Sequence, residues 1–131
     1  MIDKRKYLIQ LKLIGRQFRQ NWPDFWVDFR FSLYCLLIAA ALDVISTHHF
    51  MSLGGPQIEL HPYIRFLSIH FGIIWGPIIG KLSQLLFGLP VIIYLRRYAA
   101  WLIWSATLLY LSAFCFNIYV TAIRFGLTTI K

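Results

Sequence analysis

Charged side chains are scarce in this sequence. They make up 14% of its 131 residues, whereas a soluble domain usually has roughly 25%. Acidic side chains are the rarest, five against thirteen Lys and Arg, and only Asp43 and Glu59 come after Asp28. Hydrophobic residues, in contrast, make up 59% of the chain. This composition excludes an ordinary soluble enzyme and predicts an integral membrane protein.

Cysteine is nearly absent, because the chain has only Cys35 and Cys115. Each lies in a long apolar run, and a helical rise of ~1.5 Å per residue places the two at different depths. A disulfide between them is therefore not expected. Their spacing is also not that of a metal site, so we expect two small packing residues.

The net charge of +8 does not indicate a nucleic-acid-binding protein. Seven of the thirteen basic residues come before residue 31, which is the distribution of a cytoplasmic membrane anchor. Within an N-terminal segment of residues 1–22, residues 3–20 carry apolar and basic side chains on different faces of a helix. This pattern predicts a basic amphipathic helix at the membrane surface that attracts acidic lipid headgroups. Docking of this helix on another protein is an open alternative.

Three apolar runs are long enough to cross a bilayer, which needs about 20 residues. We expect crossings at residues 29–50, 73–94 and 98–123 within a transmembrane domain of residues 23–131. The predicted fold is therefore all-α, a three-helix membrane bundle. Lys and Arg concentrate in the N-terminal segment and at residues 96–97. By the positive-inside rule, the N-terminus is cytoplasmic and the C-terminus lies outside.

The connecting segments carry residues that end and begin helices. Asn21 or Trp22 is expected to cap the first crossing. Residues 54–56, Gly-Gly-Pro, end this crossing in a tight turn. Residues 62–72 begin with proline and end with glycine, which predicts a short helix. This helix is too short to span a bilayer, so we expect an interfacial or re-entrant segment.

The second crossing is rich in small and helix-breaking residues. Gly76 and Gly80 form a small-xxx-small pattern, which lets another helix approach closely. Pro77 removes one internal hydrogen bond, so a kink is expected nearby. The helix face that carries Gly76 and Gly80, here named the glycine face, and the N-terminal amphipathic helix are the two surfaces that favour docking onto a larger membrane complex.

One acidic residue and one lysine lie well inside the predicted crossings, where a charged residue needs a partner. Asp43 is in the first crossing, and Lys81 is the only lysine inside an apolar run. At ~1.5 Å per residue, Asp43, Lys81 and Asn117 lie in one layer. Thr47 shares a helix face with Asp43, and Gln84 shares one with Lys81. The layer is predicted to be a structural polar centre or, alternatively, a buried acid–base site.

A carboxylate and several imidazoles lie between this layer and the outer surface. The weak candidates for binding zinc or iron are His48, His49, Glu59 and His61, with His70 nearby. No HExxH-type spacing supports a metal site. The alternative is that Glu59 and His61 cap the short helix. A triad of Ser46, His48 and Asp43 is not expected, because these residues are too close on one helix.

The polar centre and the loop together give one pattern, namely Asp43-x-x-Ser46-Thr47, Glu59-x-His61-Pro62 and Lys81. This pattern resembles that of an uncharacterised prokaryotic family of small three-helix membrane proteins. The family's loop usually has Asn where this chain has His61, which weakens any claim that the amide is chemically required. The resemblance covers roughly residues 30–123. It implies a three-helix protein of a bacterial inner membrane with one polar centre, and it implies no reaction.

Three functions fit these features, and the sequence specifies no cofactor. A non-enzymatic accessory or assembly subunit of a larger membrane complex is favoured, because three crossings leave little surface to enclose a substrate. A membrane enzyme acting on a lipid or isoprenoid would use Asp43, Glu59 and His61 as acid–base or metal groups, with Lys81 as their electrostatic partner. A proton or ion carrier would use the Asp43–Lys81 layer in an oligomer.

Overall fold

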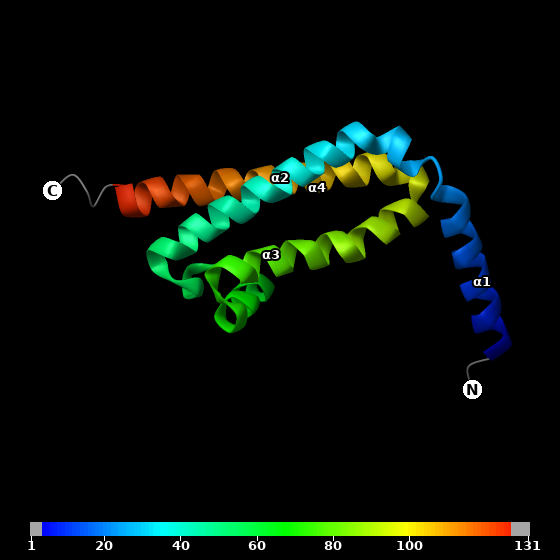
Figure 1. Cartoon of the computed structure of the whole chain (residues 1–131), viewed down its shortest axis with the longest axis horizontal. Helices are drawn as coiled ribbons and strands as arrows, with labels where there is room; N and C mark the ends of the chain where they lie inside the picture. Colours follow the sequence, from blue (N-terminus) through cyan, green and yellow to red (C-terminus); the bar gives the residue numbers. More distant parts are fainter. Residues whose placement is uncertain (1–3, 127–131) are drawn as a thin grey trace.

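A computed structural model describes residues 4–126, with side chains for residues 8–124 and 126. Over this range the chain is all-α, as expected, and contains no strand. Figure 1 shows the elements, which are α1 (Lys4–Asn21), α2 (Phe25–Gly54), the 3-10 turn η1 (Pro56–Ile58), α3 (Pro62–Tyr94), the 3-10 turn η2 (Arg96–Tyr98), α4 (Ala99–Thr121) and the π-helical turn η3 (Ala122–Gly126). The ends of the two predicted domains, residues 1–3 and 127–131, lie outside the described residues.

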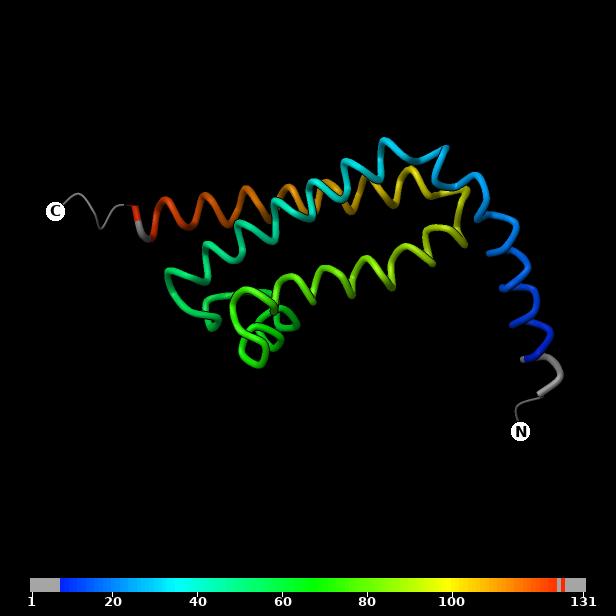
Figure 2. The backbone as a smooth tube through the Cα atoms, in the orientation of Figure 1, coloured from blue at the N-terminus to red at the C-terminus, as the bar shows by residue number. Residues whose placement is uncertain are grey.

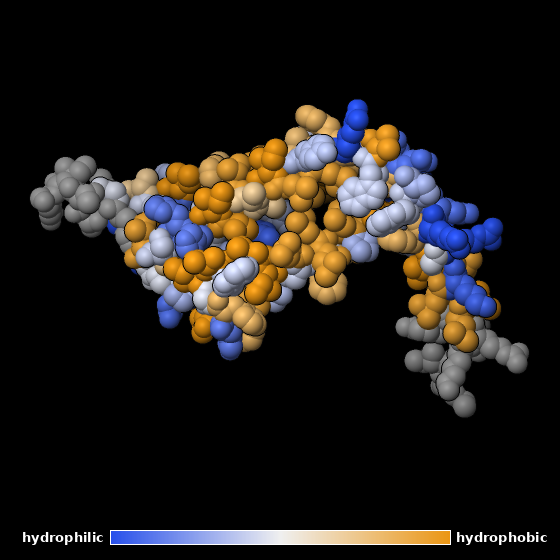
Figure 3. All heavy atoms as spheres, viewed as in Figure 1, coloured by the Kyte–Doolittle hydropathy of each residue, from blue (hydrophilic) through white to orange (hydrophobic). Residues whose placement is uncertain are grey.

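Three helical stretches in the described part are long and apolar enough to cross a membrane. They are Phe25–Gly54, Pro62–Tyr94 and Arg96–Arg124. α2 packs mainly against α4 and contacts α3 less. Figure 3 shows that hydrophobic side chains cover the middle of the visible face and that hydrophilic ones gather toward its ends. This distribution is compatible with an integral membrane protein.

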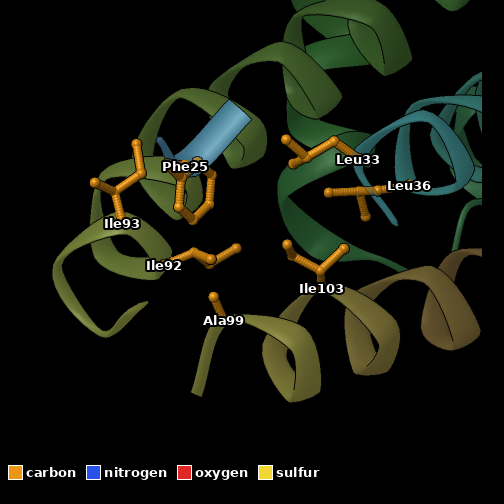
Figure 4. Packing of buried hydrophobic residues seen from close by; sticks show 7 residues of the cluster. All are labelled: Phe25, Leu33, Leu36, Ile92, Ile93, Ala99 and Ile103. Atoms are coloured by element: carbon orange, nitrogen blue, oxygen red, sulfur yellow. The ribbon is translucent and has the colours of Figure 1, made fainter. Parts of the chain in front are cut away.

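An apolar core joins α2, α3 and α4 at one end of the molecule. It consists of Phe25, Leu33, Leu36, Ile92, Ile93, Ala99 and Ile103, whose side chains converge in Figure 4. We name this end, which also carries Arg96 and Arg97, the basic end. The opposite end, with residues 55–61, is named the loop end. The core holds the three helices together at the basic end, so a site at the loop end needs contacts of its own.

α1 points away from the other helices at the basic end (Figure 1). Leu8, Leu11 and Ile14 are each about half exposed, at 58%, 51% and 47%. No other part of the described chain covers these apolar side chains. Their burial in a membrane surface stays a prediction.

Asn21 has a different role from the expected one. Its Nδ2 donates to the carbonyls of Ile93 at 3.0 Å and Tyr94 at 3.2 Å, and the last carbonyls of a helix have no partner within that helix. Asn21 therefore caps the end of α3 rather than the start of α2. α2 begins after Asp24 with no side-chain cap, so the prediction for Asn21 or Trp22 was wrong.

α3 consists of two helices that meet at Gly72. This residue has φ 86° and ψ 165°, a conformation that glycine adopts readily and other residues rarely do. The short helix of residues 62–71 therefore ends where the sequence predicted. Figure 2 shows the chain turning back before the long part of α3 begins. The break lies at Gly72 and not at Pro77, where the backbone remains helical.

The glycine face of α3 receives the chain's own short helix. A Cβ built on Gly76 would lie 2.6 Å from the main-chain nitrogen of Ser68, and it would also overlap the Ser68 Cα. A Cβ on Gly80 would overlap the end of the Ile64 side chain. The small-xxx-small pattern did predict a close neighbour. That neighbour belongs to the same chain, so this face is not open to another protein.

Candidate functional site

A cavity of about 380 Å³ lies at the loop end between α2, α3 and α4. This volume falls within the range of roughly 300–1,000 Å³ that is usual for small-molecule sites. The polar residues that line it are Asp43, Thr47, Glu59, His61, Lys81 and Asn117. The rest of its lining is mostly apolar. The cavity is therefore the place where the candidate residues from the sequence come together.

Asp43 of α2 and Lys81 of α3 form an ion pair at this cavity. Asp43 is 4% exposed, and an unpaired Asp at the centre of a membrane helix costs about 2.5–3.5 kcal/mol on insertion scales. The Lys81 Nζ also lies 3.9 Å from the centroid of the Tyr110 ring and donates to the Gln84 Oε1 at 3.4 Å. The ammonium group thus has three partners, whereas the Asp43 carboxylate has only Lys81 among the described side chains.

Tyr110 is a member of this site that sequence reasoning missed. Its hydroxyl donates to the Gln84 Oε1 at 3.2 Å, and its ring faces the Lys81 ammonium group as a cation–π partner. A tyrosine is common in membrane helices, so its presence in an apolar run does not by itself indicate a functional site. The available signal was spacing, because Tyr110 and Asn117 are seven residues apart and so lie on one face of α4.

Asn117 joins the polar centre through Thr47 and lines the same cavity as Asp43 and Lys81. Its Nδ2 donates to the hydroxyls of Ser46 at 3.2 Å and Thr47 at 2.9 Å. The Ser46 hydroxyl in turn donates to the main-chain carbonyl of Asp43 at 3.1 Å. Asn117 therefore fastens α4 to α2. Its amide nitrogen bonds to these two hydroxyls and not to the Asp43 carboxylate.

Glu59 and His61 both take part in the start of the short helix. The His61 Nδ1 accepts from the main-chain N–H of Ile64 at 3.5 Å, and the Glu59 Oε1 accepts from the N–H of His61 at 2.9 Å. Arg65 donates to the main-chain carbonyl of Glu59 at 2.7 Å, not to its carboxylate. Glu59 is 8% exposed and forms no ion pair within the part of the chain whose side chains are described. Its buried carboxylate borders the cavity without a counter-ion.

His48 compensates for Pro77. A proline at position 77 has no N–H for the carbonyl of Ile73, four residues earlier in the helix. The His48 Nδ1 lies 3.2 Å from this carbonyl oxygen. Because a carbonyl only accepts, the Nδ1 is the protonated nitrogen and donates the missing hydrogen bond. His48 thus connects α2 to the first turn of the long part of α3.

We expect His48→Phe to destabilise the protein by about 1–3 kcal/mol, because it leaves the Ile73 carbonyl without a partner. Pro77→Ala supplies a main-chain N–H for the same carbonyl. In that background, the loss caused by His48→Phe should be markedly smaller. Thermal unfolding of the four proteins in detergent measures this coupling, and an equal loss in both backgrounds would show that His48 has no such role.

The imidazoles considered as metal ligands are not brought together. His48 is engaged with Ile73, and His49 is exposed and lines a smaller cavity between α2 and α4. The His70 Nδ1 bonds to the carbonyl of Phe66 at 2.8 Å. Among the described residues, no three His, Cys, Asp or Glu side chains are grouped closely enough to hold a metal ion. The structure therefore does not assemble the metal site suggested by His48, His49, Glu59 and His61.

Most residues of the sequence pattern line this one cavity, although they come from two helices and a loop. Asp43, Thr47, Glu59, His61 and Lys81 all line it. No protein-family model, curated protein or solved structure matches the chain. The family resemblance therefore stays a prediction, and any function has to be argued from the cavity.

Proposed function

We propose that this integral membrane protein binds the polar end of an amphipathic molecule, such as a lipid or isoprenoid, in the cavity at the loop end. One observation carries the proposal: Asp43, Glu59 and Lys81 are ionisable, lie within or beside apolar helices and border the same cavity. Ionisable residues inside a membrane are costly and usually functional. A purely structural ion pair would need neither the cavity nor Glu59.

The lining of the cavity suits a molecule with one polar and one apolar end. Apolar side chains, among them Phe50, Ile64 and Phe116, complete the wall around the polar groups. α3 and α4 make little contact with each other, and the cavity has residues of both helices in its lining. An apolar chain can therefore extend between these helices while the polar end stays inside.

The charges of the cavity favour a particular kind of polar end. The lining has two carboxylates, Asp43 and Glu59, and one ammonium group, Lys81. Asp43 and Lys81 are paired, whereas the Glu59 carboxylate forms no ion pair among the described side chains, because Arg65 donates to the main-chain carbonyl of Glu59 instead. A ligand that carries positive charge or donates hydrogen bonds would supply what Glu59 lacks. If the protein is an enzyme, Glu59 and His61 are its acid–base candidates.

Ligand binding in the loop-end cavity can be tested with a larger side chain that fills the cavity. Protein purified from its native membrane in mild detergent should retain a lipid-type molecule that mass spectrometry detects. Ala113 lines the cavity, and Ala113→Phe should lower this retention at least about ten-fold, equivalent to ~1.4 kcal/mol of binding free energy. The neighbouring Ser112 is exposed, so Ser112→Phe serves as the control. Equal retention in both variants, or none in the wild type, contradicts the proposal.

An accessory or assembly subunit is the second candidate function, and α1 is the observation that favours it. α1 exposes both apolar and basic side chains and projects away from the other helices. Such a helix can dock on a partner protein as well as on lipid. The same purification tests this function, because an accessory subunit should carry a stoichiometric partner. A chain recovered only as a free monomer would argue against it.

The cavity faces the outside if the N-terminus is cytoplasmic, as the distribution of Lys and Arg favours. Both native cysteines are free, so labelling requires a background in which Cys35 and Cys115 are replaced by serine. In intact cells, Gln57→Cys at the loop end should react with an impermeant thiol reagent. Tyr98→Cys at the basic end should react only after the membrane is opened. The opposite labelling pattern would reverse the proposed orientation.

A further inference from the structure

A second cavity, of about 340 Å³, lies at the basic end, far along the helices from the loop-end cavity. α1, the end of α3 and η2 enclose it, and its polar lining consists of Gln17, Asn21, Tyr94, Arg96, Arg97 and Tyr98. α3 and α4 are joined at this end by η2, so in a bilayer spanned by these apolar helices the cavity would lie where they leave the hydrocarbon. Lipid headgroups occupy this depth.

Hydrogen bonds fix the walls of this cavity. Gln17 and Asn21 of α1 both donate to the carbonyl of Tyr94, at 3.4 and 3.2 Å. Arg96 donates to the main-chain carbonyl of Asn21 at 3.1 Å and forms an ion pair with Asp28. These donors are used within the protein, and the charge of Arg96 is balanced. These hydrogen bonds fix the walls of the cavity, but the groups that make them have few donors left for a ligand.

Arg97 is the group that remains for a ligand. Its side chain is exposed and makes no ion pair or hydrogen bond to any residue whose side chain is described. The centroid of the Tyr98 ring lies 5.8 Å from the Arg97 guanidinium carbon. A guanidinium group can donate two parallel hydrogen bonds to one phosphate. The cavity thus combines fixed walls with one unbalanced cation.

We propose that the basic-end cavity binds the phosphate of an acidic phospholipid and that Arg97 is its main ligand. Basic pockets beside membrane helices at headgroup depth are suited to such lipids. The lipid is favoured over a soluble phosphate because Leu95 lines the cavity and Val91, one turn away, is 55% exposed. These apolar side chains offer contact to an acyl chain that a soluble anion lacks. This site would hold the headgroup of a single lipid, whereas basic α1 is attracted to a charged membrane surface in general.

Native mass spectrometry of the full chain in detergent, titrated with short-chain phosphatidylglycerol or phosphatidylcholine, tests this site. The wild type should bind one phosphatidylglycerol in preference to phosphatidylcholine. Arg97→Gln should weaken this binding about ten-fold, since a charge-assisted hydrogen bond is lost. Arg97→Lys should bind with intermediate strength, because it keeps the charge without the planar fork.

Arg30→Gln is the matched control. Arg30 is exposed on α2 near the basic end and does not line the cavity, so its replacement changes the net charge by the same amount. This variant should bind phosphatidylglycerol like the wild type. Equal weakening by Arg30→Gln and Arg97→Gln would show diffuse surface charge and overturn the proposal. Equal binding of both lipids, or displacement of phosphatidylglycerol by millimolar inorganic phosphate, would also overturn it.

Discussion

Replacing either Asp43 or Lys81 alone with leucine should sharply lower the amount of folded protein in the membrane, and replacing both should restore most of it. Each single change leaves the other charge buried without its partner, which costs about 3–5 kcal/mol. Such a loss is comparable to the whole stability of many proteins, about 5–15 kcal/mol. The double variant buries two apolar side chains in place of the pair. Membrane abundance and the thermal midpoint in detergent measure both effects.

The two single variants should not be equal. In Asp43→Leu, Lys81 keeps Gln84 and the Tyr110 ring as partners. In Lys81→Leu, the Asp43 carboxylate loses its only partner among the described side chains. Lys81→Leu should therefore be the more damaging change. Losses that simply add in the double variant would show that the two residues are not coupled.

The pairing of Asp43 with Lys81 could be predicted from the depth of each residue along its own helix. The two residues lie in different apolar runs, and counting from the helix ends places them at the same level. The same counting failed for Asn117, because Tyr110, on the same face of α4 and two turns away, is the residue of α4 that lies level with Lys81. Asn117 turns toward the hydroxyls of α2, and Tyr110 takes the place next to Lys81.

The long-range roles of small and polar residues could not be deduced from local pattern. The spacing of Gly76 and Gly80 indicates a close neighbour but does not identify it, and the neighbour is the chain's own short helix. Asn21 stands just before a new helix, where capping residues are common, yet it caps a helix more than seventy residues away along the chain. Both assignments depend on how the helices are arranged, which hydrophobic periodicity does not encode.

The short helix connects the fold to the loop-end cavity. Pro62 and Ile64 of this helix line the cavity, and so do Glu59 and His61 of the loop that leads into it. Ser68 and Gly76 form the close contact that holds the short helix against the long part of α3. The position of Glu59 relative to Asp43 and Lys81 therefore depends on the contact between Ser68 and Gly76, which are both uncharged.

Gly76→Ala should be the most damaging of three matched glycine changes in α3. The added methyl group would overlap the main chain of Ser68, so the short helix has to move, at a cost of about 1–3 kcal/mol or more. At Gly80 the methyl group meets only the flexible end of Ile64, and the cost should be smaller. At Gly88 nothing lies within 4 Å, so alanine should stabilise the helix by about 0.5–1 kcal/mol. Thermal unfolding in detergent should give this order.

A second substitution at the contacting residue shows whether its main chain or its side chain causes the loss of stability in each Gly→Ala variant. Ile64→Val removes the atom that the Gly80 methyl group would meet, so it should relieve Gly80→Ala. Ser68→Gly removes the Ser68 Oγ, which the Gly76 methyl group would also overlap, but it leaves the overlapping Ser68 main chain in place, so it should not restore Gly76→Ala to full stability. Full rescue of Gly76→Ala by Ser68→Gly, or equal effects at all three glycines, would contradict the packing described here. Because the displaced helix carries Pro62 and Ile64 into the cavity lining, Gly76→Ala should also lower ligand retention, although Gly76 itself does not line the cavity. Gly88→Ala should leave that retention unchanged.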